Sequence, residues 1–225
     1  MKKFILMVLF VFINVFLFAN VEEAQKLFNE KKYQEAKTAL EKILKENPKD
    51  KKAINLMGDI YKSMIKSNPR NLNNYKLLMN FYKNNRRYSS FFKTLKRYHR
   101  YGGRYYYAEL WKLSQLAFEI KDHDTVIYLT RRCNKLNPNN HSVLNMMGVS
   151  YYYLKKYRLS VIALKAAVKT KVDHDIYNAN LARTYVSLGA YKKAYFYYKQ
   201  ALKYNPKLLR ASTSIEKVKN LMKTQ

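Results

Sequence analysis

Cysteine, glycine, proline and acidic side chains are all scarce in this sequence. Its 225 residues include one Cys, five Gly and four Pro, and 15 acidic against 44 basic side chains. A single thiol, Cys133, excludes a disulfide within the chain. Few glycines and prolines leave few breaks in secondary structure, which favours long stretches of helix. The composition therefore predicts a helical protein that no internal disulfide supports.

Sequence motifs for catalysis are equally scarce. There is no Gly-rich phosphate loop, no His-Glu-x-x-His and no serine elbow. His123 and His174 each lie between two aspartates, which could ligate a metal or exchange protons, but both triplets fall between expected helices, where Asp is a favoured N-cap. His99 and His141 are expected to join no cluster, and Cys133 falls at a small buried position. We therefore predict no enzyme, no cofactor and no metal site.

What the sequence does contain is a repeat of 34 residues. Gly148 and Ala182 are 34 residues apart, within segments of similar pattern. Small and large residues recur at fixed places, so the period reflects the packing of helix–turn–helix units that share one core. With 48% hydrophobic and 15% aromatic residues, the chain can fill such a core. The same interval joins Leu144 with Asn178, Met147 with Leu181, Tyr151 with Tyr185, Tyr157 with Tyr191, and Ala167 with Ala201.

This period and these residue types resemble the tetratricopeptide repeat (TPR) family, strongly over 141–208 and moderately over the rest of the chain after residue 20. The resemblance implies an all-α fold, a right-handed TPR α-solenoid of stacked antiparallel helix pairs. An amphipathic segment after Pro206 is expected to form a C-terminal capping helix. First helices of repeats are expected to start at 72, 107, 141 and 175.

The chain divides into three expected parts: a segment of its own over 1–20, a TPR unit plus an irregular helix over 21–71, and a TPR array with its C-terminal cap helix over 72–225. The irregularity lies at 51–71, where Asn68 and Pro69 arrive at the place of a second helix. We interpret it as a repeat without its second helix, with one longer helix over 51–67.

Residues 1–20 have the layout of a secretory signal peptide. Lys2 and Lys3 precede an apolar run from 4 to 18, and Ala19 is a small residue suited to cleavage. This layout predicts an exported protein, periplasmic or associated with the envelope. Leu17 is large where a small residue is preferred, so an uncleaved anchor formed by residues 4–19 is the alternative interpretation.

The net charge of +29 has several interpretations. A compositional bias towards Lys, Asn, Tyr and Phe would make most of it a solvated surface. The more specific interpretation is that the charge gives the protein affinity for acidic proteins or for anionic membrane surfaces. Export argues against nucleic acid as a partner, and binding to it would require a protein that is not exported.

The TPR resemblance also implies a concave groove lined by the first helix of each repeat. Its mixture of amides, aromatic rings and cations suits a peptide with acidic character, although ordinary exposed side chains are the equal alternative. Lys76 and Asn80 match half of the Lys/Asn clamp for a carboxylate found in some relatives, but Lys112, Ser142 and Met146 do not match the rest. The candidate groove positions are Lys76, Asn80, Lys83, Trp111, Gln115, Phe118, Asn145, Tyr152, Tyr153, Asn180, Arg183, Arg210 and Lys217.

These observations predict a non-enzymatic, exported TPR scaffold or adaptor that binds a peptide or protein partner in the bacterial cell envelope. The alternative is a basic structural protein of the envelope that binds anionic membrane surfaces. The third hypothesis, nucleic-acid binding, applies only without export.

Overall fold

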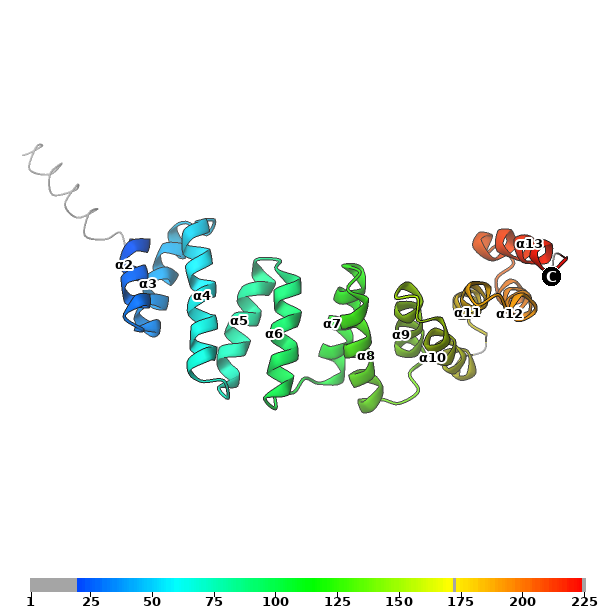
Figure 1. Cartoon of the computed structure of the whole chain (residues 1–225), viewed down its shortest axis with the longest axis horizontal. Helices are drawn as coiled ribbons and strands as arrows, with labels where there is room; N and C mark the ends of the chain where they lie inside the picture. Colours follow the sequence, from blue (N-terminus) through cyan, green and yellow to red (C-terminus); the bar gives the residue numbers. More distant parts are fainter. Residues whose placement is uncertain (1–19, 172, 224–225) are drawn as a thin grey trace, which may run out of the picture. The chain divides into compact units, whose positions relative to one another are not determined.

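The structure, a computed structural model, describes residues 20–171 and 173–223, apart from the side chain of Arg210. Over these residues it contains twelve α-helices, α2 to α13, and no strand, which confirms the predicted all-α fold (Figure 1). The signal peptide expected over 1–20 lies outside the described residues except for Asn20. None of the described helices combines the length and apolar character needed to cross a bilayer.

The helices form two compact units, one ending at Arg104 and the other beginning at Tyr105. In the first unit α2 packs on α3 and α5 packs on α6, while α4 contacts both α3 and α5. Its helices are α2 (Val21–Asn29), α3 (Tyr33–Glu46), α4 (Lys51–Ser67), α5 (Leu72–Asn84) and α6 (Tyr88–Arg100).

Helix α4 spans the 51–67 segment expected to form one long helix without a partner of its own repeat. It begins at an N-cap, because the Asp50 side chain accepts a hydrogen bond from the Ala53 N–H at 2.9 Å. At its other end the amide of Asn74, in α5, donates to the carbonyl of Met64 at 3.1 Å. The Asn68 N–H also donates to this carbonyl, at 3.0 Å, so α5 adds a second hydrogen bond at the last turn of α4 and packs against it.

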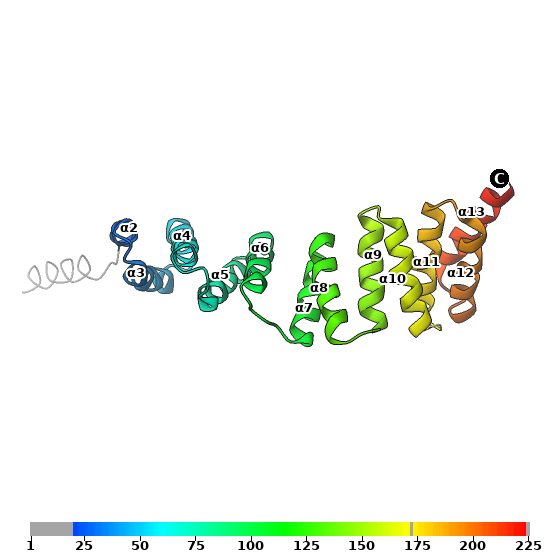
Figure 2. The ribbon, with the colours of Figure 1, turned by 60° about the horizontal axis from the view of Figure 1, so that its bottom comes forward.

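The second unit is a regular array in which each helix packs against the next, and α9 also contacts α11 (Figure 2). Its first helices begin at 107, 141 and 175, which confirms the predicted spacing. Its helices are α7 (Tyr107–Glu119), α8 (His123–Leu136), α9 (His141–Tyr153), α10 (Tyr157–Thr170), α11 (Asp175–Ser187), α12 (Tyr191–Tyr204) and α13 (Leu209–Lys223).

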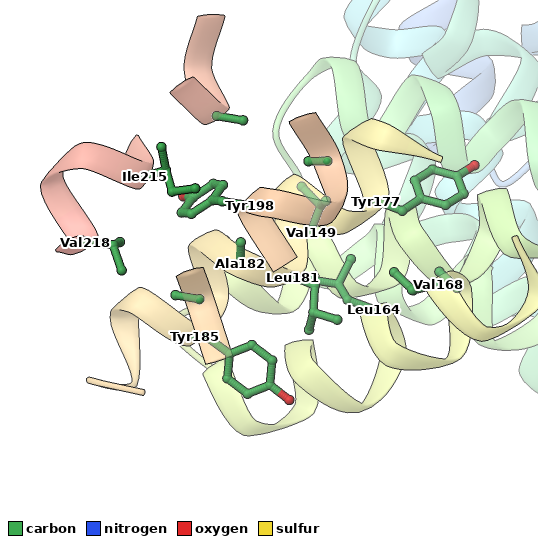
Figure 3. Close-up of a cluster of buried hydrophobic side chains, with 14 of the residues drawn as sticks. Val149, Leu164, Val168, Tyr177, Leu181, Ala182, Tyr185, Tyr198, Ile215 and Val218 are labelled. Carbon is green, nitrogen blue, oxygen red and sulfur yellow. The ribbon is translucent and has the colours of Figure 1, made fainter. Parts of the chain in front are cut away.

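Small residues let the two helices of a repeat approach closely in this array. A Cβ atom on Gly148 would lie 2.5 Å from Leu164 Cγ, well inside van der Waals contact. The Ser160 hydroxyl donates to the Gly148 carbonyl at 2.8 Å across the same crossing. Ala182, one period later, is fully buried in the core cluster together with Leu164 and Leu181 (Figure 3).

The small buried position predicted for Cys133 is also confirmed. Tyr151 and Tyr198 are buried, and Cys133 is fully buried with its Sγ 4.0 Å from the Ser114 hydroxyl. Burial raises the pKa of the Cys133 thiol, as expected for an inert side chain. Helix α13 packs on α12 and buries Ala211, Ile215 and Val218, so it is the predicted capping helix. Its exposed positions include Lys217 and Lys219.

The turn inside each regular repeat uses one residue with positive φ. These turns join the first helix to the second, and the residues are Lys31, Arg86, Lys121, Lys155 and Gly189, with φ between 54° and 69°. The last three are again 34 residues apart. Only Gly189 has no Cβ atom. The other four are basic residues in a left-handed conformation, which is sterically unfavourable for residues with a Cβ atom.

Removing the Leu181 side chain tests the shared core. Leu181 is fully buried, whereas Ile162 is 66% exposed on α10. We expect Leu181→Ala to lower the free energy of unfolding by about 2–5 kcal/mol, because it loses buried surface and leaves a cavity. Ile162→Ala should change it by less than about 0.5 kcal/mol. Urea unfolding followed by circular dichroism measures both; similar losses in the two variants would contradict the assigned core.

Candidate functional site

The candidate positions of the first unit form one exposed stripe. Lys76, Asn80 and Lys83 are all exposed on α5, and their spacing of four and three residues places them on the same helix face. They are two cations and an amide, with no aromatic neighbour among the candidate positions of this unit.

The candidate positions of the second unit meet around Arg183, on α11. Its guanidinium carbon lies 4.3 Å from the ring centre of Tyr152 and 5.8 Å from that of Tyr153, both on α9. Cation–π contacts of this kind contribute about 0.5–2 kcal/mol. The Nε atom of Arg183 is buried and has no hydrogen-bond partner among the described residues. Two successive repeats therefore contribute to one cationic and aromatic surface.

This surface continues onto the preceding repeat through a histidine. Tyr153 stacks on His123, with ring centres 4.7 Å apart and planes at 9°. The ring of Phe118 lies edge-on to His123 at 5.8 Å. We call Phe118, His123, Tyr152, Tyr153 and Arg183 the aromatic row. Burial lowers the pKa of His123, against the opposing effect of Asp122 and Asp124, and this favours a neutral ring in the row.

From its place in the sequence, His123 is expected at a corner between helices and outside the groove. Its capping prediction holds for this triplet, because the Asp122 side chain accepts a hydrogen bond from the Thr125 N–H at 3.1 Å. His123 itself is the first residue of α8, and its ring turns toward the end of α9. The repeat pattern could have indicated this contact. The first residue of a second helix lies beside the end of the first helix of the following repeat.

The remaining candidates lie beside the aromatic row or apart from it. The Asn180 amide donates to the Asn145 side-chain oxygen at 3.1 Å, which links α11 to α9. Trp111 is half-buried and Gln115 exposed on α7, and Lys217 is exposed on α13. Arg210 belongs to α13, and its side chain lies outside the described part of the chain.

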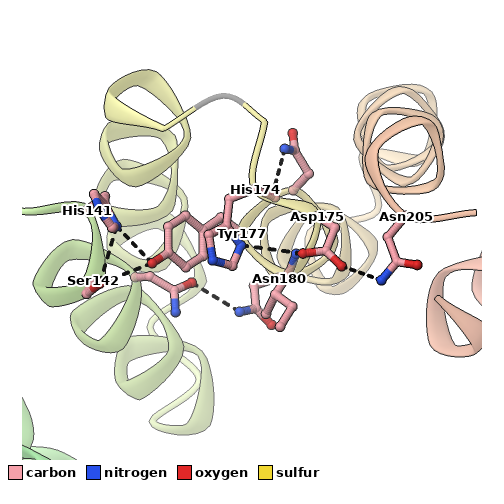
Figure 4. A network of polar contacts seen from close by, with 10 residues as sticks. His141, Ser142, His174, Asp175, Tyr177, Asn180 and Asn205 are labelled. Atoms are coloured by element: carbon pink, nitrogen blue, oxygen red, sulfur yellow. Dashed lines mark hydrogen bonds and ion pairs between the residues drawn. The ribbon is translucent and has the colours of Figure 1, made fainter. Parts of the chain in front are cut away.

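A second polar cluster occupies the corner between the repeats that start at 141 and 175 (Figure 4). His141 Nδ1 lies 2.9 Å from the Tyr177 hydroxyl, and the Ser142 hydroxyl lies 3.2 Å from both atoms. The ring of His174 stacks on Tyr177, with centres 3.6 Å apart and planes at 4°. The prediction that His141 joins no cluster is therefore wrong, because stacking brings the starts of two successive first helices together.

The second Asp-His-Asp triplet also differs from its predicted capping role. His174, and not Asp173, is the N-cap of α11, and it makes no side-chain capping bond. Asp175 Oδ2 accepts a hydrogen bond from the Asn205 amide at 2.7 Å, and this bond is the main cause that lowers the pKa of Asp175. Its Oδ1 lies 3.5 Å from His174 Nδ1, a distance at which the two do not form a hydrogen bond. The corner is a structural joint between α9, α11 and α12.

Neither cluster has the composition of a metal centre. Across the residues that the structure describes, no three His, Cys, Asp or Glu side chains gather as metal ligands would. The aromatic row instead offers flat rings, one guanidinium and nearby amides, which are groups that recognise another macromolecule by contact.

Comparison with known proteins identifies the repeat. Residues 177–208 match the family model of the tetratricopeptide repeat. No curated protein matches the chain.

Several solved structures share the fold at low sequence identity. YrrB, a TPR protein with an unusual peptide-binding site, is 14% identical, with 88% of this chain and all of that chain covered at a TM-score of 0.52. The first TPR of Spaghetti (RPAP3), bound to an HSP90 peptide, is 16% identical over 52% of this chain and 92% of that one, with a TM-score of 0.50. The TPR domain of Sgt2 from Aspergillus fumigatus is 14% identical over 52% and 79%, with a TM-score of 0.50. These likenesses show the TPR fold.

The stability of the corner should depend on pH through His174. Burial lowers its pKa below the ordinary 6.5, so the unfolded chain binds more protons as pH falls through that value, and the free energy of unfolding decreases. Asp175, with its lowered pKa, adds a separate loss only as pH falls through about 4. We expect the melting temperature to drop between pH 7.5 and 5.5.

His174→Phe tests this assignment, because Phe keeps a ring against Tyr177 and cannot be protonated. The variant should show a smaller drop in melting temperature over the same pH range than the natural chain. An equal drop in melting temperature in the two proteins would show that His174 is not the source of the pH dependence.

Proposed function

We propose that this TPR chain is a non-enzymatic scaffold that binds a peptide or protein segment along the aromatic row of its second unit. The observation that carries the proposal is the position of Arg183. Its guanidinium lies over Tyr152 and Tyr153, it forms no ion pair among the described residues, and its Nε has no partner. Tyr153 is 53% exposed and the other four residues of the row are half-buried, so a partner can reach the row from solvent at Tyr153.

The chemistry of the row fits an acidic partner. Tyrosine rings supply large contact areas at a low cost in conformational entropy, since each has two rotatable bonds. A guanidinium whose face lies on a ring still presents N–H donors at its edge, and these bind carboxylates strongly. A chain with a net charge of +29 also attracts acidic partners over longer distances.

Two of the structural relatives support the choice of a peptide. The description of YrrB gives it a peptide-binding site, and the RPAP3 domain is seen with an HSP90 peptide. At 14% and 16% identity they share the fold, so they support the class of partner and leave its identity to this chain's own side chains.

Photo-crosslinking tests whether the row binds protein. A photo-reactive amino acid at Tyr153 should crosslink a partner in the native cell, whereas the same amino acid at Phe196, 54% exposed on α12, should not. Arg183→Ala should lower the yield at Tyr153 by about fivefold or more, the effect of about 1 kcal/mol. Lys192→Ala, which removes one positive charge from an exposed position of α12, should leave the yield unchanged.

Equal yields at Tyr153 and Phe196 would overturn the proposed surface. A loss in Lys192→Ala as large as that in Arg183→Ala would replace it with attraction by overall charge. Melting temperatures of both variants confirm that each remains folded.

We further propose that the scaffold works in the bacterial cell envelope after export and removal of a signal peptide. The sequence of residues 1–20 supports this, and so does the start of α2. Asn20 is the N-cap of α2, its side chain accepting a hydrogen bond from the Glu22 N–H at 3.1 Å. Cleavage after Ala19 would therefore leave α2 and its cap intact.

The mass of the protein isolated from its native cell checks export directly. We expect a chain that begins at Asn20 and is recovered from the envelope fraction. A full-length chain in the envelope would support the alternative of an uncleaved anchor. A full-length chain in the cytoplasm would contradict export and restore nucleic acid as a candidate partner.

A further inference from the structure

A pocket of about 410 Å³ lies between α8 and α10, the second helices of two successive repeats. It shares no residue with the aromatic row. Its size suits a small ligand or the head group of a larger one. It is lined by Asp124, Ile127, Tyr128, Arg131, Arg132, Tyr151, Lys156 and Leu159.

Two arginines of this pocket are positioned by tyrosines. Arg131 Nη2 donates a hydrogen bond to the Tyr151 hydroxyl at 2.7 Å, and Tyr151 is buried. The guanidinium carbon of Arg132 lies 4.1 Å from the ring centre of Tyr128, one turn earlier on α8. In the described ranges neither arginine forms an ion pair with a carboxylate. Both guanidinium groups are thus held in place while N–H donors remain for a ligand.

The charge of the pocket favours an anion. Arg131, Arg132 and Lys156 face a single carboxylate, Asp124, which leaves an excess of two positive charges. Lys156 is the N-cap of α10 and makes no side-chain capping bond. The positive end of the helix dipole of α10 therefore adds to the same field. Two arginines and a lysine around one cavity are the donors that bind phosphate oxygens.

An apolar edge adjoins these cations. Leu159 lines the pocket and is 42% exposed, and Ile162, 66% exposed, follows three residues later on α10. Residues three apart lie on the same face of a helix. A free anion gains nothing from such an edge, whereas a lipid phosphate is joined to glycerol and acyl groups that can contact it.

We propose that the α8–α10 pocket binds a phosphate group presented by the head group of an anionic phospholipid. The arginines and Lys156 bind the phosphate oxygens, and Leu159 and Ile162 contact the glycerol and the first acyl carbons. This site is separate from the aromatic row, so a membrane lipid and a protein partner can be bound at the same time.

Titration calorimetry of the full chain with water-soluble ligands tests the site. The probes are dihexanoyl phosphatidylglycerol below its micelle concentration, glycerol phosphate and inorganic phosphate. Every form of the protein carries the same residues 1–20, so any contribution of that segment is equal in each. We expect phosphatidylglycerol to bind more tightly than either soluble phosphate, and binding to weaken as salt is raised.

Variants with matched charge separate this site from general attraction. Arg131→Gln with Arg132→Gln should weaken the binding of phosphatidylglycerol by about tenfold or more, because two charge-assisted hydrogen-bond donors are lost. Lys165→Gln with Lys169→Gln removes two charges from exposed positions of α10 and should weaken it by less than about twofold. Lys156→Gln leaves the Arg131–Tyr151 bond in place and should weaken binding severalfold even if the double arginine variant proves unstable.

The outcomes are distinct. Equal losses in the arginine pair and the lysine pair, with no effect of Lys156→Gln, overturn the site in favour of overall charge. Equal affinity for inorganic phosphate and phosphatidylglycerol, lost in the arginine pair, overturns the lipid and assigns the pocket to a soluble phosphate. Absence of binding by all three probes overturns the proposal.

Discussion

The close approach of two helices at a small residue is the constraint on which the second unit depends. Gly148 sits so near Leu164 that no side chain fits between them, and the Ser160 hydroxyl bonds across the same crossing. Ala182 is buried at the corresponding place of the next repeat. With the distance between helices set at this point, larger side chains can fill the core that runs from α9 to α13. Surfaces such as the aromatic row then follow from what remains outside it.

The two units differ in which helices pack against the first helix of a repeat. In the regular array each first helix has its own second helix, and α13 covers the last pair. In the other unit α4 packs against both α3 and α5, and the amide of Asn74 in α5 adds a hydrogen bond at the last turn of α4. The irregular repeat therefore keeps its long helix packed against the helices on either side of it in the chain.

The helices could be predicted from the sequence because packing between helices determines where small and aromatic residues recur. The sequence predicted the starts at 107, 141 and 175 and the burial of Cys133. It was not sufficient to predict which side chains of successive repeats meet, because that depends on the offset between stacked hairpins. His123 in the aromatic row, His141 against Tyr177, and Arg131 against Tyr151 are all contacts of this kind.

The turns with positive φ link the charge of this protein to its stability. Lys31, Arg86, Lys121 and Lys155 occupy a backbone conformation that costs a residue with a Cβ atom about 1–2 kcal/mol, where Gly189 meets no such cost. At each of these four sites the chain accepts an unfavourable backbone conformation and carries a cation at a turn. Glycine at any of these bends would remove that cost together with one positive charge, so part of the basic surface is displayed at the expense of stability.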